Sequence, residues 1–302
     1  MRLGVAATPD VAIPTLDWLL GTDHEIALVI TQPDRPSGRG RVVKQSVVGQ
    51  WAEKHELAVL KPESSFELGN HLKDLDCVIT IGYGVLLPQE ILDIPKFGFL
   101  NLHFSLLPAY RGAAPVQRAL LHGEIETGVT VFQLEKGMDT GPIYSQISIP
   151  IDPNWRSFEL FQRLAQEGPA AINEALKMIE QGVHPTPQSG QSTVAGKITK
   201  EEARIDFMES AQRIINHIRA FTYEPGAWTL WNGESFKITS AVVNEGQKLT
   251  IGEIRMLDNF VYVGCGNDTM IELLSVVPAG KREMPAVDWA RGARLLGGEK
   301  LG

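Results

Sequence analysis

Residues 101–115 read N-L-H-F-S-L-L-P-A-Y-R-G-A-A-P, and residues 127–141 read T-G-V-T-V-F-Q-L-E-K-G-M-D-T-G. The first stretch closes an apolar, strand-like run, and the second passes from such a run into a glycine-bounded loop. An amide (Asn101), an imidazole (His103) and a carboxylate (Asp139) therefore stand where strands end and loops begin. An amide can hold a developing oxyanion, and the other two groups can handle protons. The pattern predicts a site that moves an acyl group onto an amine.

Strand-like and helix-like patterns alternate around this stretch. Strands are predicted at 3–7, 25–31, 58–60, 77–81 and 97–103, and helices at 11–20, 46–56 and 66–75. Such alternation predicts parallel strands joined by crossovers, and continuous apolar strands predict a sheet covered on both faces. The expected fold is a doubly wound, mainly parallel α/β sheet, which binds ligands beyond the carboxyl ends of its strands. Its first turn, A-A-T-P-D, lacks the G-x-G-x-x-G of dinucleotide-binding folds.

The composition of the sequence and its pattern of strands and helices change after the first half. Two more strands (127–135 and 143–150) and a long helix (157–181) precede a polar stretch rich in Pro, Gly, Ser and Thr at 184–196, which is typical of a linker. A helix and five short strands follow, at 210–221, 227–231, 235–242, 252–257, 260–263 and 270–276. Short strands with frequent turns predict a small β-barrel of the oligonucleotide-binding type. We expect a catalytic domain at 1–184, a linker at 185–203 and a barrel domain at 204–302.

Composition limits the function classes. The 302 residues carry a net charge of −8, so bulk attraction to nucleic acid is excluded and RNA binding would need local basic patches. The two cysteines, Cys77 and Cys265, lie in apolar runs and predict buried, reduced thiols. No C-x-x-C or His/Cys cluster indicates a metal. Neither a membrane-length apolar run nor a signal-peptide layout is found, so a cytoplasmic protein without membrane contact is expected. We also expect a monomer.

The run Asn101-x-His103-x-Ser-Leu-Leu-Pro, with Asp139-x-Gly141 further along, resembles the formyltransferase superfamily. The resemblance implies 10-formyltetrahydrofolate as co-substrate and no metal. It implies that Asn101 and His103 stabilise the oxyanion. Asp139 either accepts a proton through water or keeps His103 charged. It also implies a folate pocket formed by Ser105, Leu106, Leu107, Pro108, Tyr83, Gly84 and Leu86.

The acceptor is indicated by other segments. Residues 32–46, Q-P-D-R-P-S-G-R-G-R-V-V-K-Q-S, concentrate basic residues in what must be an exposed loop, suited to phosphate contacts. This loop and the segments 198–207, 219–229 and 278–284 resemble the branch of the family that formylates methionyl initiator tRNA. The resemblance implies tRNA contacts from Arg35, Arg39, Arg41, Lys44, Lys281 and Arg282.

The expected function is formyl transfer from 10-formyltetrahydrofolate to the amino group of initiator methionyl-tRNA, which supplies N-formylmethionyl-tRNA for translation initiation. One alternative is a sugar-nucleotide N-formyltransferase with the same donor, against which the basic loop and the C-terminal segments argue. A second is a folate- or RNA-binding protein without catalysis. The intact Asn101, His103 and Asp139 argue against that reading.

Overall fold

The computed structural model describes residues 1–37, 42–244, 246, 248–295 and 297–302. The chain divides into two compact units. Unit 1 comprises Met1–Pro115, Glu126–Pro150 and Phe161–Ala195, and unit 2 comprises Val116–Ile125, Ile151–Leu160 and Gly196–Gly302. The limits at residues 184 and 204, expected from the sequence, stay a prediction.

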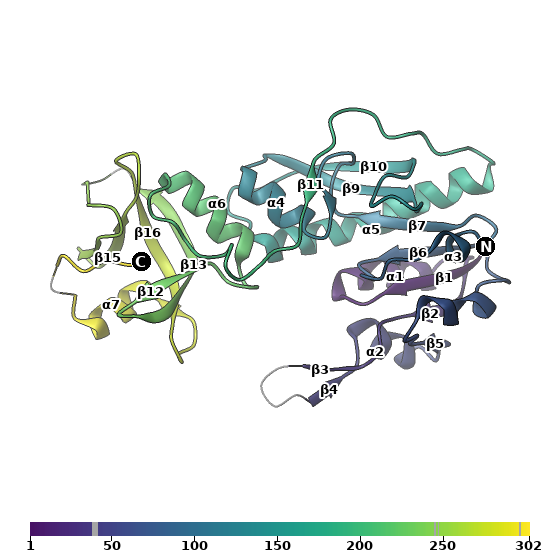
Figure 1. The fold of residues 1–302 in the computed structure, drawn as a ribbon, viewed down its shortest axis with the longest axis horizontal. Coiled ribbons are helices and arrows are strands. Elements are labelled where there is room, and N and C mark those ends of the chain that lie inside the picture. The colour runs from purple at the N-terminus through teal and green to yellow at the C-terminus, as the bar shows by residue number, and fades with distance from the viewer. Residues whose placement is uncertain (38–41, 245, 247, 296) are drawn as a thin grey trace. The chain divides into compact units, whose positions relative to one another are not determined.

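Unit 1 is built on a seven-stranded sheet with the order β10-β9-β7-β6-β1-β2-β5 (Figure 1). The strands are β1 (Arg2–Ala7), β2 (Glu25–Ile30), β5 (Val59–Leu60), β6 (Cys77–Ile81), β7 (Phe99–His103), β9 (Glu126–Gln133) and β10 (Ile143–Pro150). The five strands from β5 to β7 pair in parallel, and β9 and β10 add two antiparallel pairings at one side. The predicted mainly parallel sheet is confirmed.

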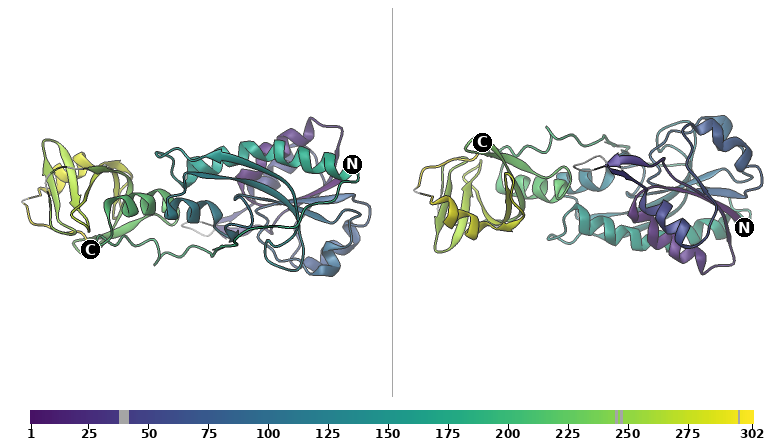
Figure 2. Two further views of the ribbon diagram at one scale, coloured as in Figure 1. Left: turned by 90° about the horizontal axis from the view of Figure 1, so that it is seen from above. Right: turned by 90° about the horizontal axis from the view of Figure 1, so that it is seen from below.

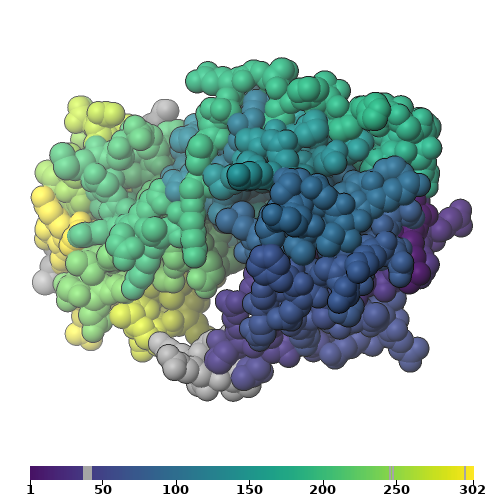
Figure 3. All heavy atoms as spheres, turned by 45° about the vertical axis from the view of Figure 1, so that its right-hand side comes forward, coloured from purple at the N-terminus to yellow at the C-terminus, as the bar shows by residue number. Residues whose placement is uncertain are grey.

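Helical elements cover both faces of this sheet (Figure 2). They are η1 (Asp10–Ala12), α1 (Ile13–Leu20), α2 (Val47–Lys54), η2 (Ser65–His71), α3 (Gln89–Leu92) and α5 (Ser157–Glu180). On one face α5 packs so closely on α1 and β7 that a Cβ at Gly168 would lie 2.4 Å from Thr15 Oγ1 and 2.9 Å from Leu102 Cδ2. On the other face η2 and α3 bury Leu68, Leu72 and their neighbours against the sheet. The η2–α3 region forms much of the blue surface in Figure 3.

Three local expectations differ from the structure. The helix expected at 66–75 is the 3-10 helix η2, in which Gly69 and Asn70 weaken α-helix propensity. The expected loop at 32–46 contains an antiparallel hairpin of β3 (Arg35–Ser37) and β4 (Val42–Lys44). Within the expected linker, β11 (Val194–Ala195) pairs in parallel with β8 (Arg111–Gly112). These two- and three-residue strands lie in segments rich in Gly, Pro and polar residues, whose local patterns do not indicate strands.

Unit 2 contains a six-stranded antiparallel sheet, of which the sequence predicted five strands as parts of a small β-barrel. It has the order β12-β13-β16-β15-β14, with β17 beside β16. Its elements are α4 (Pro115–His122), which begins at the boundary between the units, α6 (Ala211–Phe221), β12 (Trp228–Trp231), β13 (Glu234–Asn244), β14 (Ile254–Leu257), β15 (Phe260–Gly264), β16 (Met270–Pro278), β17 (Met284–Pro285) and α7 (Ala286–Ala293). Residues 299–302 connect the two sheet edges. Leu301 N donates to Gly252 O at 2.9 Å, and Gly302 N donates to Leu230 O of β12 at 3.1 Å.

Two predictions from composition concern membranes and thiols. In the part of the chain that the structure describes, no helix is both long and apolar enough to cross a bilayer. Cys77 and Cys265 are free and buried, as predicted. Burial raises the pKa of each thiol to about 12, so neither is a nucleophile at neutral pH.

Candidate active site

Asn101 and His103 lie two residues apart on β7, so their side chains project from the same face of the sheet. Asn101 stands opposite Thr80 of β6 in the parallel register. The Thr80 hydroxyl lies 2.8 Å from Asn101 Oδ1 and 3.0 Å from the carbonyl oxygen of Leu100, and donates its proton to these two acceptors. The amide oxygen is therefore anchored, and Nδ2 is the donor that Asn101 can offer to a ligand.

His103 ends β7 and is 6% exposed. Its Nε2 lies 2.9 Å from the carbonyl oxygen of Tyr110. A carbonyl oxygen only accepts hydrogen bonds, so Nε2 carries the hydrogen and Nδ1 is the basic nitrogen of the neutral ring. Nδ1 faces Asp139 Oδ2 at 3.7 Å, and the ring meets Phe132 edge to face at a centroid distance of 6.3 Å.

The pKa of His103 is lowered from its ordinary value of 6.5, mainly because burial penalises the charged ring. The charge of Asp139 and the hydrogen bond to the Tyr110 carbonyl act in the opposite direction and are smaller. The imidazole is therefore mostly neutral at pH 7. A mostly neutral imidazole does not fit one of the two roles expected for Asp139, that of keeping His103 charged.

Asp139 lies in the loop between β9 and β10, with a backbone φ of 51°. Its Oδ2 accepts a hydrogen bond of 2.7 Å from the backbone N–H of Gly112. At Gly141 the loop returns against β9 so closely that a Cβ would lie 1.8 Å from the carbonyl oxygen of Gln133. The loop conformation thus depends on a glycine two residues beyond the carboxylate.

Some residues that hold this group were not singled out by the sequence. Gln188 donates from Nε2 to the carbonyl oxygens of Asp139 and Gly141, both at 2.8 Å. The hydroxyl of Thr193 accepts a hydrogen bond of 2.8 Å from the N–H of Tyr110. Both belong to the stretch interpreted as a linker, whose composition gives no signal of such contacts. Thr80 carries the single hydroxyl of the apolar run C-V-I-T-I, and nothing in that run indicates a contact with Asn101.

The Ser-Leu-Leu-Pro segment follows β7 as a tightly bonded loop. Ser105 Oγ donates to Ala109 O at 2.7 Å. The N–H of Leu107 donates to Thr130 Oγ1 at 3.1 Å, and Gln146 Nε2 donates to Leu107 O at 2.7 Å. The N–H and the carbonyl oxygen of Leu107, a residue assigned to the folate pocket, therefore already have partners within the protein. Ser105 and Leu107 are buried, whereas Leu106 and Pro108 are partly exposed.

The second segment assigned to folate follows β6. Tyr83 is buried, and its carbonyl oxygen accepts a hydrogen bond of 2.8 Å from Gln32 Nε2. Gly84 has a φ of 73°, in the region that favours glycine. Leu86 is 89% exposed, which leaves its whole side chain available to a ligand.

The basic residues expected to contact tRNA fall into two groups. Arg35 and Lys44 are exposed and stand opposite each other on β3 and β4. Asp34, the acidic residue beside them, forms an ion pair of 2.9 Å with Lys61. Arg39 and Arg41 lie outside the described residues. In unit 2, Lys281 and Arg282 are exposed in the turn after β16.

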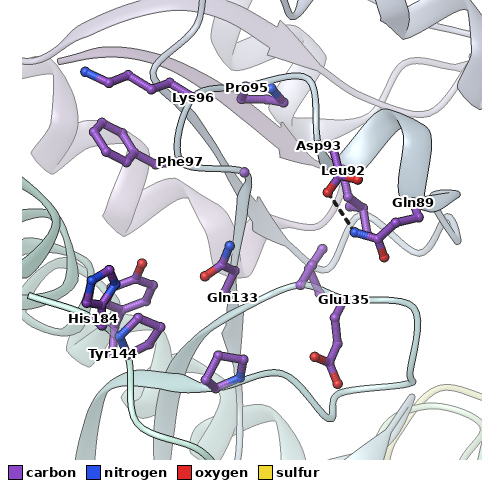
Figure 4. Close-up of a pocket in the computed structure, with 14 residues that line it drawn as sticks. Gln89, Leu92, Asp93, Pro95, Lys96, Phe97, Gln133, Glu135, Tyr144 and His184 are labelled. Atoms are coloured by element: carbon purple, nitrogen blue, oxygen red, sulfur yellow. Dashed lines mark hydrogen bonds between the residues drawn. The ribbon is translucent and has the colours of Figure 1, made fainter.

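A separate cavity of about 510 Å³ lies at the amino end of β7 (Figure 4). Gln89 and Asp93, joined by a 2.8 Å hydrogen bond, line one side, and Tyr144 and His184 line another. Asn101, His103 and Asp139 are not among its lining residues. Parallel α/β sheets bind substrates at the carboxyl ends of their strands, where His103 lies, whereas this cavity lies at the opposite end of β7. Among the described residues, no group of three or more His, Cys, Asp or Glu side chains could hold a metal ion.

The fold agrees with the comparisons to known proteins. The formyl transferase family matches residues 6–176, and the formyl transferase C-terminal domain family matches residues 197–294. The chain therefore belongs to the formyl transferase family, which confirms the resemblance seen in the sequence. Over 309 aligned residues it is 42% identical to the methionyl-tRNA formyltransferase of Thermobifida fusca, with 100% of this chain and 99% of that protein covered.

Two solved structures share the fold at low identity. The N-formyltransferase from Helicobacter canadensis, solved with folinic acid and dTDP-3-aminofucose, has a TM-score of 0.70 at 20% identity, covering 90% of this chain and 98% of that one. The methionyl-tRNA formyltransferase from Clostridium thermocellum has a TM-score of 0.59 at 16% identity, covering 82% and 95%. Because sugar and tRNA enzymes both match, the fold alone does not select the acceptor.

Proposed function

We propose that this protein transfers the formyl group of 10-formyltetrahydrofolate to the free amino group of initiator methionyl-tRNA. The product is N-formylmethionyl-tRNA for translation initiation. The observation that carries the chemistry is the buried, neutral His103, whose Nδ1 faces Asp139 at 3.7 Å on the strand that also bears Asn101. The acceptor is supported by the 42% identity along the whole chain to a methionyl-tRNA formyltransferase.

Asn101 acts on the oxygen of the formyl group. The donor supplies an activated formyl group, with the reduced folate as leaving group. As the methionyl amine adds to the formyl carbon, negative charge builds up on that oxygen. Asn101 Nδ2 donates a hydrogen bond to it, and one such fixed donor contributes about 3 kcal/mol to lowering the barrier. Thr80 holds the amide in the orientation that directs Nδ2 rather than Oδ1 to the ligand.

His103 and Asp139 move the proton. The attacking nitrogen becomes positively charged as the new C–N bond forms, and His103 Nδ1 takes one of its protons. The carboxylate of Asp139 stabilises the resulting imidazolium. His103 then returns the proton to the departing folate nitrogen as the old C–N bond breaks, so the ring ends the cycle neutral. His103 was also expected to stabilise the oxyanion. We assign this role to the protonated ring, which exists after the amine has added and before the folate nitrogen departs.

The binding assignments are also proposals. The folate donor contacts the loops that follow β6 and β7, and exposed Leu86 and partly exposed Leu106 are the most accessible apolar groups there. The tRNA contacts the β3–β4 hairpin through Arg35 and Lys44 and the turn after β16 through Lys281 and Arg282. The protein acts as a monomer in the cytoplasm, where initiator tRNA is charged.

One assay tests the proposal. Purified protein and formylfolate are incubated with initiator methionyl-tRNA, elongator methionyl-tRNA or a nucleotide-linked amino sugar. Rapid formylation of the initiator, slower formylation of the elongator and none of the sugar are expected. Transfer to the amino sugar alone would replace the proposal with the sugar-nucleotide function. Folate binding without transfer to any acceptor would support a binding protein.

A further inference from the structure

Residues 181–195, which follow α5, support the His103–Asp139 pair through hydrogen bonds. Within unit 1, the 110–112 segment provides one backbone partner for each group: the carbonyl oxygen of Tyr110 accepts from His103 Nε2, and the N–H of Gly112 donates to Asp139 Oδ2. This short segment is in turn bonded to the chain after α5. The N–H of Tyr110 donates to Thr193 Oγ1, and β8 pairs with β11.

The side chain of Gln188, in that segment, reaches the loop between β9 and β10 that contains Asp139. Its Nε2 donates to the carbonyl oxygens of Asp139 and Gly141, both at 2.8 Å. Its Oε1 accepts from Arg111, at 3.1 Å from Nε and 2.6 Å from Nη2. Both amide hydrogens and the amide oxygen are thus hydrogen-bonded. The Gln188 side chain therefore connects the Asp139 loop to Arg111, the neighbour of Gly112.

This arrangement determines where the carboxylate lies. Asp139 has a φ of 51°, which L-residues rarely adopt, so the surrounding contacts must hold the loop in place. Gln188 binds the backbone on both sides of the loop's last turn, and Arg111 keeps Gln188 oriented. Only a side chain with two donors and one acceptor can satisfy all three partners.

We propose that Gln188 is a positioning residue for Asp139 in formyl transfer, acting through the loop backbone and anchored by Arg111. The inference rests on the proposed function for its kinetic effect. Gln188 does not touch the reacting atoms. It holds the carboxylate beside His103 Nδ1, and without it the loop would let Asp139 move away from the ring.

The first test uses two substitutions of similar size. Gln188→Met removes all four hydrogen bonds, and Gln188→Glu keeps the acceptor for Arg111 but loses both donors. Both are expected to lower kcat about tenfold with KM for either substrate nearly unchanged, because catalysis is sensitive to small displacements of catalytic groups. Gln191→Met, at an exposed position in the same segment, is the matched control and should retain wild-type kcat.

The second test asks whether Gln188 acts through Asp139. In an Asp139→Asn background, Gln188→Met should cause no further loss in single-turnover rate, because the carboxylate it positions is gone. An equal loss in both backgrounds would overturn the proposal and leave Gln188 a structural residue. A Gln188→Glu enzyme with wild-type kcat would also overturn it.

A titration separates this inference from the proposed function. Asp139 is the charged group that acts on His103, with Tyr110 contributing through its carbonyl and Phe132 only as a ring. Displacing Asp139 should therefore lower the pKa of His103 in Gln188→Met, as measured by NMR without any substrate. An unchanged pKa would contradict the positioning role. Absence of wild-type formylation would contradict only the proposed function.

Discussion

Nδ1 of His103 lies 3.7 Å from Oδ2 of Asp139, while Nε2 of the same ring donates to the carbonyl of Tyr110 at 2.9 Å. The ring is thus held by one nitrogen and presents the other to a carboxylate. Because burial outweighs the attraction of that carboxylate, the pKa of His103 lies below 6.5. A neutral base beside a negative group can accept a proton from the attacking amine and be stabilised once it has done so.

The titration of His103 gives the first prediction. NMR of the wild type should show His103, assigned by comparison with His103→Gln, titrating below pH 6.5. Asp139→Asn should lower this pKa further, because the carboxylate is a cause that raises it. The single-turnover rate should fall as the pH drops through the His103 pKa, since protonated Nδ1 cannot accept a proton. A His103 that titrates above 6.5 would mean that Asp139 keeps it charged.

Substitutions at Asn101 and at Thr80 are expected to lower kcat by different amounts. Asn101→Ala removes the oxyanion donor and should lower kcat about a hundredfold or more. Thr80→Val removes the hydroxyl that anchors the amide and should lower kcat about five- to tenfold, the effect of one lost hydrogen bond. Thr80→Ser keeps the hydroxyl and should stay close to wild type. Equal rates for the Thr80→Val and Thr80→Ser enzymes would show that Asn101 needs no such anchor.

The β3–β4 hairpin is expected to contact tRNA. Replacing both Arg35 and Lys44 by Ala should lower kcat/KM for methionyl-tRNA at low salt, with folate affinity unchanged. The difference from wild type should shrink as salt rises, because phosphate contacts are screened and release counterions. Lys73→Ala, at another exposed position of unit 1, is the control. A double variant with wild-type kcat/KM at low salt would leave the hairpin without a role in tRNA binding.

Gly168 tests the packing of α5. Ala is normally favoured over Gly in a helix by about 1 kcal/mol. Here a Cβ would lie 2.4 Å from Thr15 Oγ1 and 2.9 Å from Leu102 Cδ2, so we expect Gly168→Ala to destabilise the protein by about 1–3 kcal/mol. Thermal unfolding measures this, and Thr15→Ala in the same chain should restore part of the loss. A higher Tm for Gly168→Ala would show that α1 and α5 can separate without cost.

Regular elements with long local patterns were predictable. The apolar strand runs and amphipathic helices gave the parallel sheet and its crossovers, because buried strands and helices require continuous or periodic apolar residues. Five of the six strands in the sheet of unit 2 were predicted in the same way, and the two-residue β17 was not. The prediction of an α-helix at 66–75 was wrong. It relied on the helical spacing of the apolar residues and gave too little weight to Gly69 and Asn70, which are poor helix formers. The β3–β4 hairpin and the β8–β11 pairing were missed because their strands lie in segments rich in Gly, Pro and polar residues, whereas the two-residue β5 lies in an apolar run and was predicted.

The sequence by itself determined the identity and order of Asn101, His103 and Asp139, because their chemistry and spacing are local properties of the chain. Only the tertiary structure decided the protonation of His103, since burial and the distance to Asp139 arise when β7 and the β9–β10 loop meet. It also decided that Gln188, in a stretch with the composition of a linker, bonds the Asp139 loop. Hydrogen bonds between residues far apart in the chain depend on positions that folding creates, and no local pattern records them.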